Sequence, residues 1–433
     1  MEQTPANIVH WFRDAAPYIN RHREKTFVVY FSGEAVQSSG FDNLIHDLAI
    51  LHALGIRLVL VYGARPQIDR RIRLEEITPR FAHGLRITDD RSLDPVIEAV
   101  GRLRVIIEAR LSLSLANTPM SGSRIRVCSG NFITARPLGV RNGIDFHHTG
   151  EVRRVQAKAI GAQLAAGQCV LLSPLGYSPT GEVFNLRAEE VATETAIALG
   201  ADKLILMNDK PLPDDLPDQL TPPQIDELLL QQRLPGMLST HLRNARAAID
   251  GGVARCHVID HERDGSLLLE LFTRDGAGTL ISAAAFEDMR QATINDVGGI
   301  LALIEPLERD GLLVRRSREQ LELEIHHFTV VERDGKIIAC AALYPYEQER
   351  AGEIACVAVH PDYRHDRRGE RLVEYLERTA MLRRLDYLFV LSTQTMHWFR
   401  ELGFEPASLD DLPLEKAALY NYQRRSKIFI KKL

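Results

Sequence analysis

The sequence holds few of the features that mark secreted or membrane-spanning proteins. Its five cysteines are scattered and none lies in a CxxC pair, so we expect reduced thiols instead of a disulfide framework. No run of 18 apolar residues occurs, and the N-terminal stretch lacks the apolar core of a signal peptide. We therefore expect a cytoplasmic protein with no membrane partner.

A basic excess is also lacking. The formal net charge is −5 and the sequence pI is about 6.3, which argues against a nucleic-acid partner. Apolar residues make up 45% of the chain and charged residues 26%, the composition of an ordinary folded protein. Its 433 residues are enough for two or three domains.

Metal-ligand patterns are scarce as well. His257 and His261 have the spacing of a metal pair on a helix, but the segment VARCHVID around His257 alternates like a strand. Along a strand this spacing spans about 13 Å, too far for one ion. We expect no metal site.

The first part of the chain predicts an α/β domain over 25–283, after an N-terminal helix within 1–24. Residues 26–36 form an apolar, β-branched run, and 41–55 show helical spacing that ends at a glycine. Uniformly apolar strands alternating with helices indicate a parallel sheet covered on both faces, and the rhythm returns at 169–207.

A different pattern of predicted strands and helices begins after a predicted linker at 284–293. Within 294–433, two apolar runs flank an Arg-Asp-Gly turn at 333–335, the signal of an antiparallel hairpin. A third strand at 352–360, a helix near 369–384, a strand at 387–393 and a short helix follow, with a last strand near the C-terminus. The pattern predicts an α+β domain.

An arginine-rich turn lies between the third strand and the long helix of this domain. A helix N-terminus leaves backbone N–H groups unpaired and attracts phosphate, and Gly369 permits close approach of the backbone. Cationic partners for such an anion are Arg364, Arg367, Arg368 and Arg371. The alternative is a solvated turn whose arginines pair with nearby carboxylates.

The order of elements around this turn resembles the Gcn5-related N-acetyltransferase (GNAT) fold. In that fold the segment R/Q-x-x-G-x-G/A holds the pyrophosphate of acetyl-CoA, and it matches 364–369 here, with Arg367 in place of the first glycine. The stretches LLVRRSRE, GEIACVAV, HWFRELGF and YNYQRRSK together resemble the bacterial N-acetylglutamate synthase family. Stretches such as LLSPLGYSPTGEVFNL extend the resemblance into the first domain, which is similar to the amino-acid kinase fold.

The resemblance implies direct transfer of an acetyl group from acetyl-CoA to L-glutamate, the first step of arginine biosynthesis, with acetyl-CoA as co-substrate and no tightly bound cofactor. It implies that Glu353 is the general base and Ser392 the general acid, with Thr393 as competitor. The implied glutamate ligands are Arg316, Arg424 and Ser426, with Arg315 and Arg425 as adjacent alternatives. The implied acetyl-CoA site comprises Cys356, Val357, Val359, Arg364, Arg367, Arg368 and Gly369.

The first domain departs from the kinase pattern at its phosphate-handling points. The first strand lacks the kinase lysine, the turn after the second reads Tyr-Gly-Ala-Arg-Pro over 62–66, and Glu189 replaces a metal-handling aspartate. The resemblance instead implies feedback inhibition by L-arginine bound near His257, Glu270 and Gly276, in a hexamer formed partly through the N-terminal helix.

Three alternatives stay open from the sequence. One is an N-acetylglutamate kinase or a bifunctional enzyme, and another is a non-catalytic arginine sensor. The third concerns only the effector site: CHVID and LLLELFT would be plain core strands that bind no effector.

Overall fold

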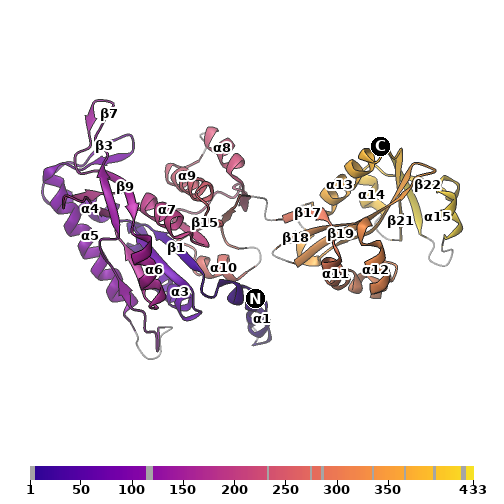
Figure 1. The fold of residues 1–433 in the computed structure, drawn as a ribbon, viewed down its shortest axis with the longest axis horizontal. Helices are drawn as coiled ribbons and strands as arrows, with labels where there is room; N and C mark the ends of the chain where they lie inside the picture. Colours follow the sequence, from indigo (N-terminus) through magenta and orange to yellow (C-terminus); the bar gives the residue numbers. More distant parts are fainter. Residues whose placement is uncertain are drawn as a thin grey trace. The chain divides into compact units, whose positions relative to one another are not determined.

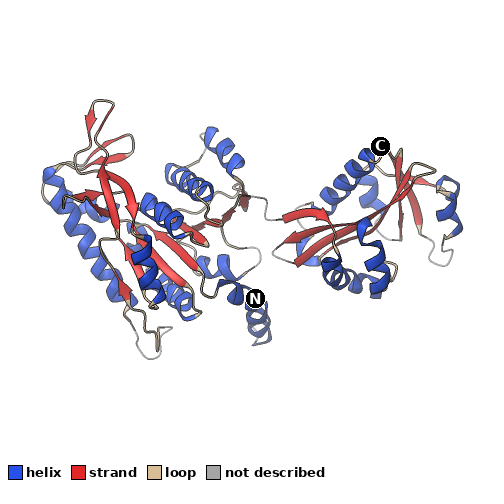
Figure 2. Cartoon of the chain, in the orientation of Figure 1, coloured by secondary structure: helices blue, strands red, loops and turns tan. Residues whose placement is uncertain are grey.

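The structure is a computed structural model, and it describes residues 5–113, 120–231, 234–273, 276–283, 287–333, 336–364, 367–393, 396–420 and 426–433. The chain divides into two compact units, 1–285 and 286–433, and each is described by itself (Figure 1). Figure 2 shows that both units mix helices with strands. None of the helices in the described residues is long and apolar enough to cross a membrane.

The first unit consists of helices arranged around two main sheets. Its helices are α1 (Pro5–His22), α2 (Gly33–Gln37), α3 (Phe41–Ala53), α4 (Arg65–Leu74), α5 (Asp90–Leu111), α6 (Ala157–Ala165), α7 (Ala188–Leu199), α8 (Pro222–Leu230), α9 (Gly236–Asp250) and α10 (Ser266–Phe272). Its strands are β1 (Thr26–Phe31), β2 (Arg57–Tyr62), β3 (Arg80–Ala82), β4 (Leu85–Ile87), β5 (Val127–Cys128), β6 (Ile133–Pro137), β7 (Val140–Arg141), β8 (Ile144–Asp145), β9 (Gly150–Val155), β10 (Cys169–Leu172), β11 (Leu175–Tyr177), β12 (Val183–Asn185), β13 (Lys203–Asn208), β14 (Gln219–Leu220), β15 (Arg255–Asp260) and β16 (Thr279–Ile281).

The large sheet of this unit has the order β14-β16-β15-β13-β1-β2-β10-β5. The neighbours from β15 to β5 in this order pair in parallel, and β1 lies between β13 and β2. Alternate residues of β1 enter two separate cores, Phe27 and Val29 on one face and Val28 and Tyr30 on the other. The prediction of a parallel sheet covered on both faces is confirmed, because β1 is apolar at both alternations.

The second unit is a single seven-stranded sheet with helices on both faces. Its helices are α11 (Val297–Arg309), α12 (Arg318–Glu324), α13 (Arg368–Leu382), α14 (Met396–Glu401) and α15 (Leu414–Ala418). Its strands are β17 (Glu287–Gln291), β18 (Phe328–Arg333), β19 (Lys336–Tyr346), β20 (Ala351–Val359), β21 (Tyr387–Ser392), β22 (Glu405–Ala407) and β23 (Lys427–Lys432), in the order β17-β18-β19-β20-β21-β23-β22.

Two cores flank this sheet. Helix α13 packs on one face through Leu372 and Leu376, and α11 packs on the other through Ile300 and Ile304. Figure 1 shows α13 and α11 on opposite sides of the strands. The predicted hairpin is confirmed, since β18 and β19 pair antiparallel.

Two sequence expectations need correction. The predicted linker 284–293 contains β17, which pairs antiparallel with β18 over Glu287–Gln291. Part of the predicted linker is therefore a strand that extends the sheet. The interpretation of LLLELFT as a core strand is wrong, because Ser266–Phe272 form helix α10 and bury Leu267 and Leu271 from one face. The strand reading of the CHVID segment is confirmed by β15.

Candidate active site

A cleft opens where two parallel strands of the second unit separate. Strands β20 and β21 pair only from Ala351 to Glu353, opposite Tyr387 to Phe389. Within the described residues the two strands do not pair beyond these positions, although β20 continues to Val359 and β21 to Ser392. The edge of β20 that faces β21 is therefore open to a ligand.

A bulge in β20 accompanies this separation. Its register with β19 shifts between Cys340 and Ala342, because Cys340 pairs with Ala358 while Ala342 pairs with Ala355. Cys356 lies in the bulge with a φ of 53°, in the left-handed region. The bulge places residues of β20 along the cleft.

The cleft has a volume of about 530 Å³. Residues 354–359 of β20 line one wall, and residues 390–392 of β21 together with Thr393, which follows the strand, line another. Arg364, Arg367 and Gly369 close one end, and Trp398 of α14 contributes an aromatic surface. The main-chain binding residues expected from the sequence, Cys356, Val357 and Val359, are thus together in one cavity with the arginine turn.

The turn has an arginine where the motif has its first glycine, and this arginine adopts a strained backbone conformation. Arg367 has a φ of 54° and a ψ of 25°, the left-handed conformation that glycine adopts most easily. Arg367, at the start of α13, makes no capping hydrogen bond through its own side chain, and the N-terminus of a helix attracts anions. The guanidinium of Arg367 pairs with Glu370.

Arg368 behaves differently from its neighbours. Its side chain is buried, Nη1 donates to the carbonyl oxygen of Tyr363 at 3.1 Å, and the guanidinium lies over the Tyr363 ring. The sequence interpretation counted Arg368 among the cations of the turn. The structure instead turns its side chain into the protein, where it supports the loop before α13.

Glu353 lies where the pairing of β20 and β21 ends, and its carboxylate is buried. Nζ of Lys416 lies 2.7 Å from Oε1, and the Tyr346 hydroxyl donates to Oε2 at 3.4 Å. Burial, followed by the charge of Glu353, raises the pKa of Tyr346. Sequence reasoning missed Lys416 and Tyr346, because neither lies in a motif and each reaches Glu353 only through the fold.

Ser392 ends β21 and lies on the wall of the cleft, next to Thr393. Both hydroxyl-bearing residues expected to compete as the general acid therefore border the cleft. The Ser392 side chain is largely buried.

Arg316 lies close to the bulge. Its Nη1 donates to the carbonyl oxygen of Val314 at 3.1 Å, and its backbone N–H donates to Glu308 at 2.9 Å. The hydrogen bond from Cys340, and after it the Arg316 charge, lower the pKa of the Cys356 thiol although burial opposes them. The structure thus brings this predicted glutamate ligand near β20.

Of the other two predicted glutamate ligands, Ser426 lies among the described residues. Ser426 lines a second cavity, of about 830 Å³, together with His397, Arg400 and Lys427. Its carbonyl oxygen accepts from the Tyr420 hydroxyl at 2.6 Å. Arg424 lies outside the described residues.

Comparisons with known proteins agree with this geometry. Residues 25–260 match the Amino acid kinase family, and residues 300–404 match the Acetyltransferase (GNAT) family. Curated amino-acid acetyltransferases from Pseudomonas fluorescens and Azotobacter vinelandii are each 56% identical over 430 residues, covering 98% of this chain and 99% of theirs. The chain belongs to the amino-acid acetyltransferase family.

Solved structures extend the likeness of this acetyltransferase to its whole length. N-acetylglutamate synthase from Neisseria gonorrhoeae, complexed with coenzyme A and L-arginine, is 38% identical with a TM-score of 0.88. The same synthase complexed with coenzyme A and N-acetyl-glutamate is 39% identical with a TM-score of 0.62. Both comparisons cover 98% of this chain and 99% of the other.

The kinase-like unit of the acetyltransferase retains a cavity of about 470 Å³ where its phosphate-handling positions meet. Glu189 lines it and accepts a hydrogen bond from Tyr30 of β1 at 3.0 Å. Gly63 and Arg65 line it as well, and Arg65 begins α4 where the kinase pattern has bare backbone. The three departures seen in the sequence therefore border one site, which weakens its capacity to hold polyphosphate.

The predicted effector residues of the acetyltransferase converge on one carboxylate. Nδ1 of His257 lies 2.5 Å from Oε1 of Glu270, and Nζ of Lys203 lies 3.0 Å from Nε2 of His257. A Cβ added at Gly276 would lie 2.6 Å from Oε2 of Glu270. The three effector residues predicted from the sequence thus contribute to one buried cluster. They lie far along the chain from the acetyl-transfer motifs.

Charge is balanced within this cluster. Burial, and after it the charge of Lys203, lowers the pKa of His257 to about 4. Burial opposes ionisation of Glu270, but the His257 contact and the backbone amides of Ala277 and Gly278 lower its pKa. The Glu270 carboxylate is therefore ionised at neutral pH, although its side chain is only 5% exposed.

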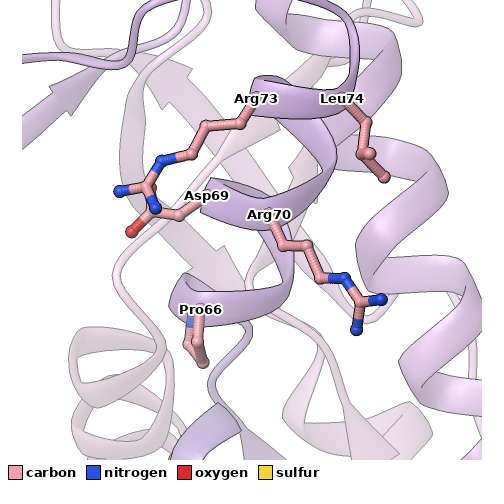
Figure 3. A pocket seen from close by; sticks show the side chains of 5 residues that line it. All are labelled: Pro66, Asp69, Arg70, Arg73 and Leu74. Atoms are coloured by element: carbon pink, nitrogen blue, oxygen red, sulfur yellow. The ribbon is translucent and has the colours of Figure 1, made fainter.

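One further cavity, of about 390 Å³, lies along α4. Figure 3 shows the five side chains that line it, which all come from residues 66–74. Since a single helix supplies every lining residue, no second element brings opposing chemistry, and we assign no function to this cavity.

Proposed function

We propose that this acetyltransferase moves the acetyl group of acetyl-CoA directly to the α-amino group of L-glutamate, and that L-arginine bound to the first unit inhibits it. The observation that carries the proposal is the cleft between β20 and β21, which begins beside the buried Glu353 carboxylate. The complexes of the gonococcal synthase with coenzyme A, N-acetyl-glutamate and L-arginine support this choice of ligands.

Each requirement of acetyl transfer has a candidate group on β20 or β21, near the point where the two strands separate. Glu353 removes a proton from the substrate ammonium, directly or through water, so that the free amine can attack the thioester carbonyl. Main-chain groups of β20 at Cys356, Val357 and Val359 hold the thioester, and Ser392 protonates the departing thiolate. The C–S bond breaks as the amide bond forms.

The anionic parts of both substrates meet cations or amides. The pyrophosphate of acetyl-CoA binds the start of α13, beside Arg364 and Arg367 and over Gly369. The backbone of Arg368, whose side chain is turned inward, belongs to the same helix start. The glutamate carboxylates bind Arg316, Arg424 and Ser426, since guanidinium groups bind carboxylates with a two-point fork.

The first unit has a regulatory role in this proposal. The L-arginine guanidinium binds the Glu270 carboxylate, and His257 and Gly276 border the same place. The product of acetyl transfer, N-acetylglutamate, enters arginine biosynthesis. L-arginine, the end product of that pathway, thus controls the first step of its own synthesis. We further propose a cytoplasmic hexamer formed partly through the N-terminal helix. Regions 25–283 and 294–433 are proposed as the regulatory and catalytic domains.

A thiol-release assay with acetyl-CoA and a panel of amino acids tests the proposal. We expect thiol release with L-glutamate, little with L-aspartate or L-glutamine, and less with L-glutamate once L-arginine is added. Equal release with every amino acid would overturn the glutamate assignment. An ADP-release assay with N-acetylglutamate and ATP tests the kinase alternative, for which we expect no product because the phosphate-handling groups are replaced.

A further inference from the structure

We propose that Lys416 is a positioning residue for acetyl transfer, which acts on the substrate amine through Glu353. The inference rests on the proposed role of Glu353 as the general base. Nζ of Lys416 lies 2.7 Å from Oε1 of Glu353, and their side chains are only 25% and 9% exposed. A pair this buried is weakly screened by solvent, unlike an ordinary surface salt bridge.

The fold holds Lys416 in place through its own helix. Helix α15 carries Lys416, and Ala417 on the same helix packs against a small core that contains Phe389 of β21. The backbone N–H of Leu414 donates to Glu349 at 3.3 Å. Since Phe389 is the residue that pairs with Glu353, the core that anchors α15 includes the last paired position of β20 and β21, where the carboxylate lies.

Each oxygen of the Glu353 carboxylate has one contact, and the two contacts come from different elements. Lys416 of α15 contacts Oε1, and Tyr346 of β19 donates to Oε2. Tyr346 also lies close to Glu415 and Glu349. Their charges raise the pKa of Tyr346, but less than burial and the charge of Glu353 do. Among the described residues, Lys416 is the cation that pairs with the Glu353 carboxylate.

This cation has two consequences for the acceptor amine. It orients the carboxylate, which fixes the direction from which a proton is accepted. It also repels a second ammonium, so a substrate bound at Glu353 is favoured as the free amine, the form that can attack the thioester. Both consequences act on the chemical step more than on the ground-state binding of glutamate.

A purely structural role would look different. If Lys416 only anchored α15, its removal would lower stability, and any loss of rate would be independent of Glu353. Lys431 offers a matched control, because it pairs with Glu377 at 2.6 Å and the two side chains are 27% and 14% exposed. Lys431→Met removes a comparable ion pair on the same sheet.

The experiment compares Lys416→Met, Lys416→Arg and Lys431→Met in the full-length enzyme, each alone and in the Glu353→Gln background. We expect Lys416→Met to lower kcat about 10-fold or more without raising the KM for glutamate, and Lys416→Arg to restore most of it. Lys431→Met should change kcat less than about 2-fold, and Lys416→Met should cause no further loss when Glu353 is already Gln.

Thermal unfolding separates the two explanations further, since Lys416→Met and Lys431→Met should lower the midpoint by similar amounts. An inactive Glu353→Gln together with a Lys416→Met variant that keeps the kcat of the Lys431→Met control would overturn the positioning role alone. A Glu353→Gln variant with full kcat would overturn both the base assignment and this inference.

Discussion

Glu270 and His257 form a buried pair in which Oε1 of the carboxylate lies 2.5 Å from Nδ1 of the ring. The second oxygen, Oε2, accepts the backbone N–H groups of Ala277 and Gly278 at 2.7 and 2.9 Å. The carboxylate is thus held from two sides, by β15 through His257 and by the turn after α10. A guanidinium that binds there acts on both segments at once.

Removing this charge should blunt inhibition by L-arginine. Glu270→Gln keeps the shape of the side chain but loses the charge that would bind a guanidinium, so we expect the half-inhibitory concentration of L-arginine to rise 10-fold or more, by about 1.4 kcal/mol or more of binding. Uninhibited kcat should stay within about 2-fold. Glu190→Gln, which removes a carboxylate paired with Arg187, is the control. An unchanged inhibition curve would remove Glu270 from the effector site.

Glycine is required at 276 for two separable reasons. Its φ is 70°, and an added Cβ would lie 2.6 Å from Oε2 of Glu270. Gly265 has a φ of 69° with nothing near its missing Cβ, so Gly265→Ala measures the backbone strain alone, about 1 kcal/mol. We expect Gly276→Ala to cost at least about 1 kcal/mol more in chemical unfolding, because the carboxylate must move. Equal losses would mean that the carboxylate yields freely.

Glu353→Gln should lower kcat by about 100-fold or more, since the amide cannot accept a proton from the ammonium. The KM for acetyl-CoA should change little, because we propose that the arginine turn and α13 hold that substrate. Glu377→Gln is the matched control, since Glu377 also pairs with a lysine of the same unit. If the Glu353→Gln enzyme has the same rate as the control at every pH, Glu353 is not the general base.

Arg367→Gly should separate stability from binding. Relief of the left-handed φ of 54° is expected to stabilise the second unit by about 1 kcal/mol or less, while loss of the guanidinium should raise the KM for acetyl-CoA several-fold. Arg384→Gly, at a φ of 61°, should relieve similar strain without affecting that KM. Equal KM values in the two variants would show that Arg367 does not contact the coenzyme.

The first unit should lose stability in mild acid. Burial lowers the pKa of His241 to about 4, against about 6.5 in the unfolded chain, and neither ring nitrogen has a hydrogen-bond partner among the described residues. The folded state therefore favours the neutral ring. Its contribution is complete above about pH 6.5 and is lost as the pH falls toward 4.

His241→Leu should remove this part of the acid sensitivity. Between pH 8 and pH 5 the wild type should lose about 2 kcal/mol more unfolding free energy than the variant, as measured by urea unfolding. His22 and His257 also have lowered pKa values of about 4, so the variant should still retain some acid sensitivity. Parallel losses in wild type and variant would mean that His241 is hydrated in the fold.

The sequence alone determined the elements whose signals are local. Apolar runs such as TFVVYF and RLVLVY became buried parallel strands, and the Arg-Asp-Gly turn joined β18 to β19, because periodicity and turn chemistry act over a few neighbouring residues. The arginine turn, Glu353 and the effector residues were likewise predicted from contiguous motifs and resemblance, and their roles stay predictions. The substitution of Arg367 for glycine was visible in the sequence, but the glycine-like backbone it adopts was not.

Tertiary structure decided which groups contact one another across long separations. It turned Arg368 inward onto Tyr363, made a helix of LLLELF, and extended the sheet with β17 inside the predicted linker. It also brought Lys416 to Glu353, residues 63 positions apart in the chain. Such contacts depend on where strands diverge and helices pack, and no local pattern encodes the distance between two side chains that only the assembled sheet brings together.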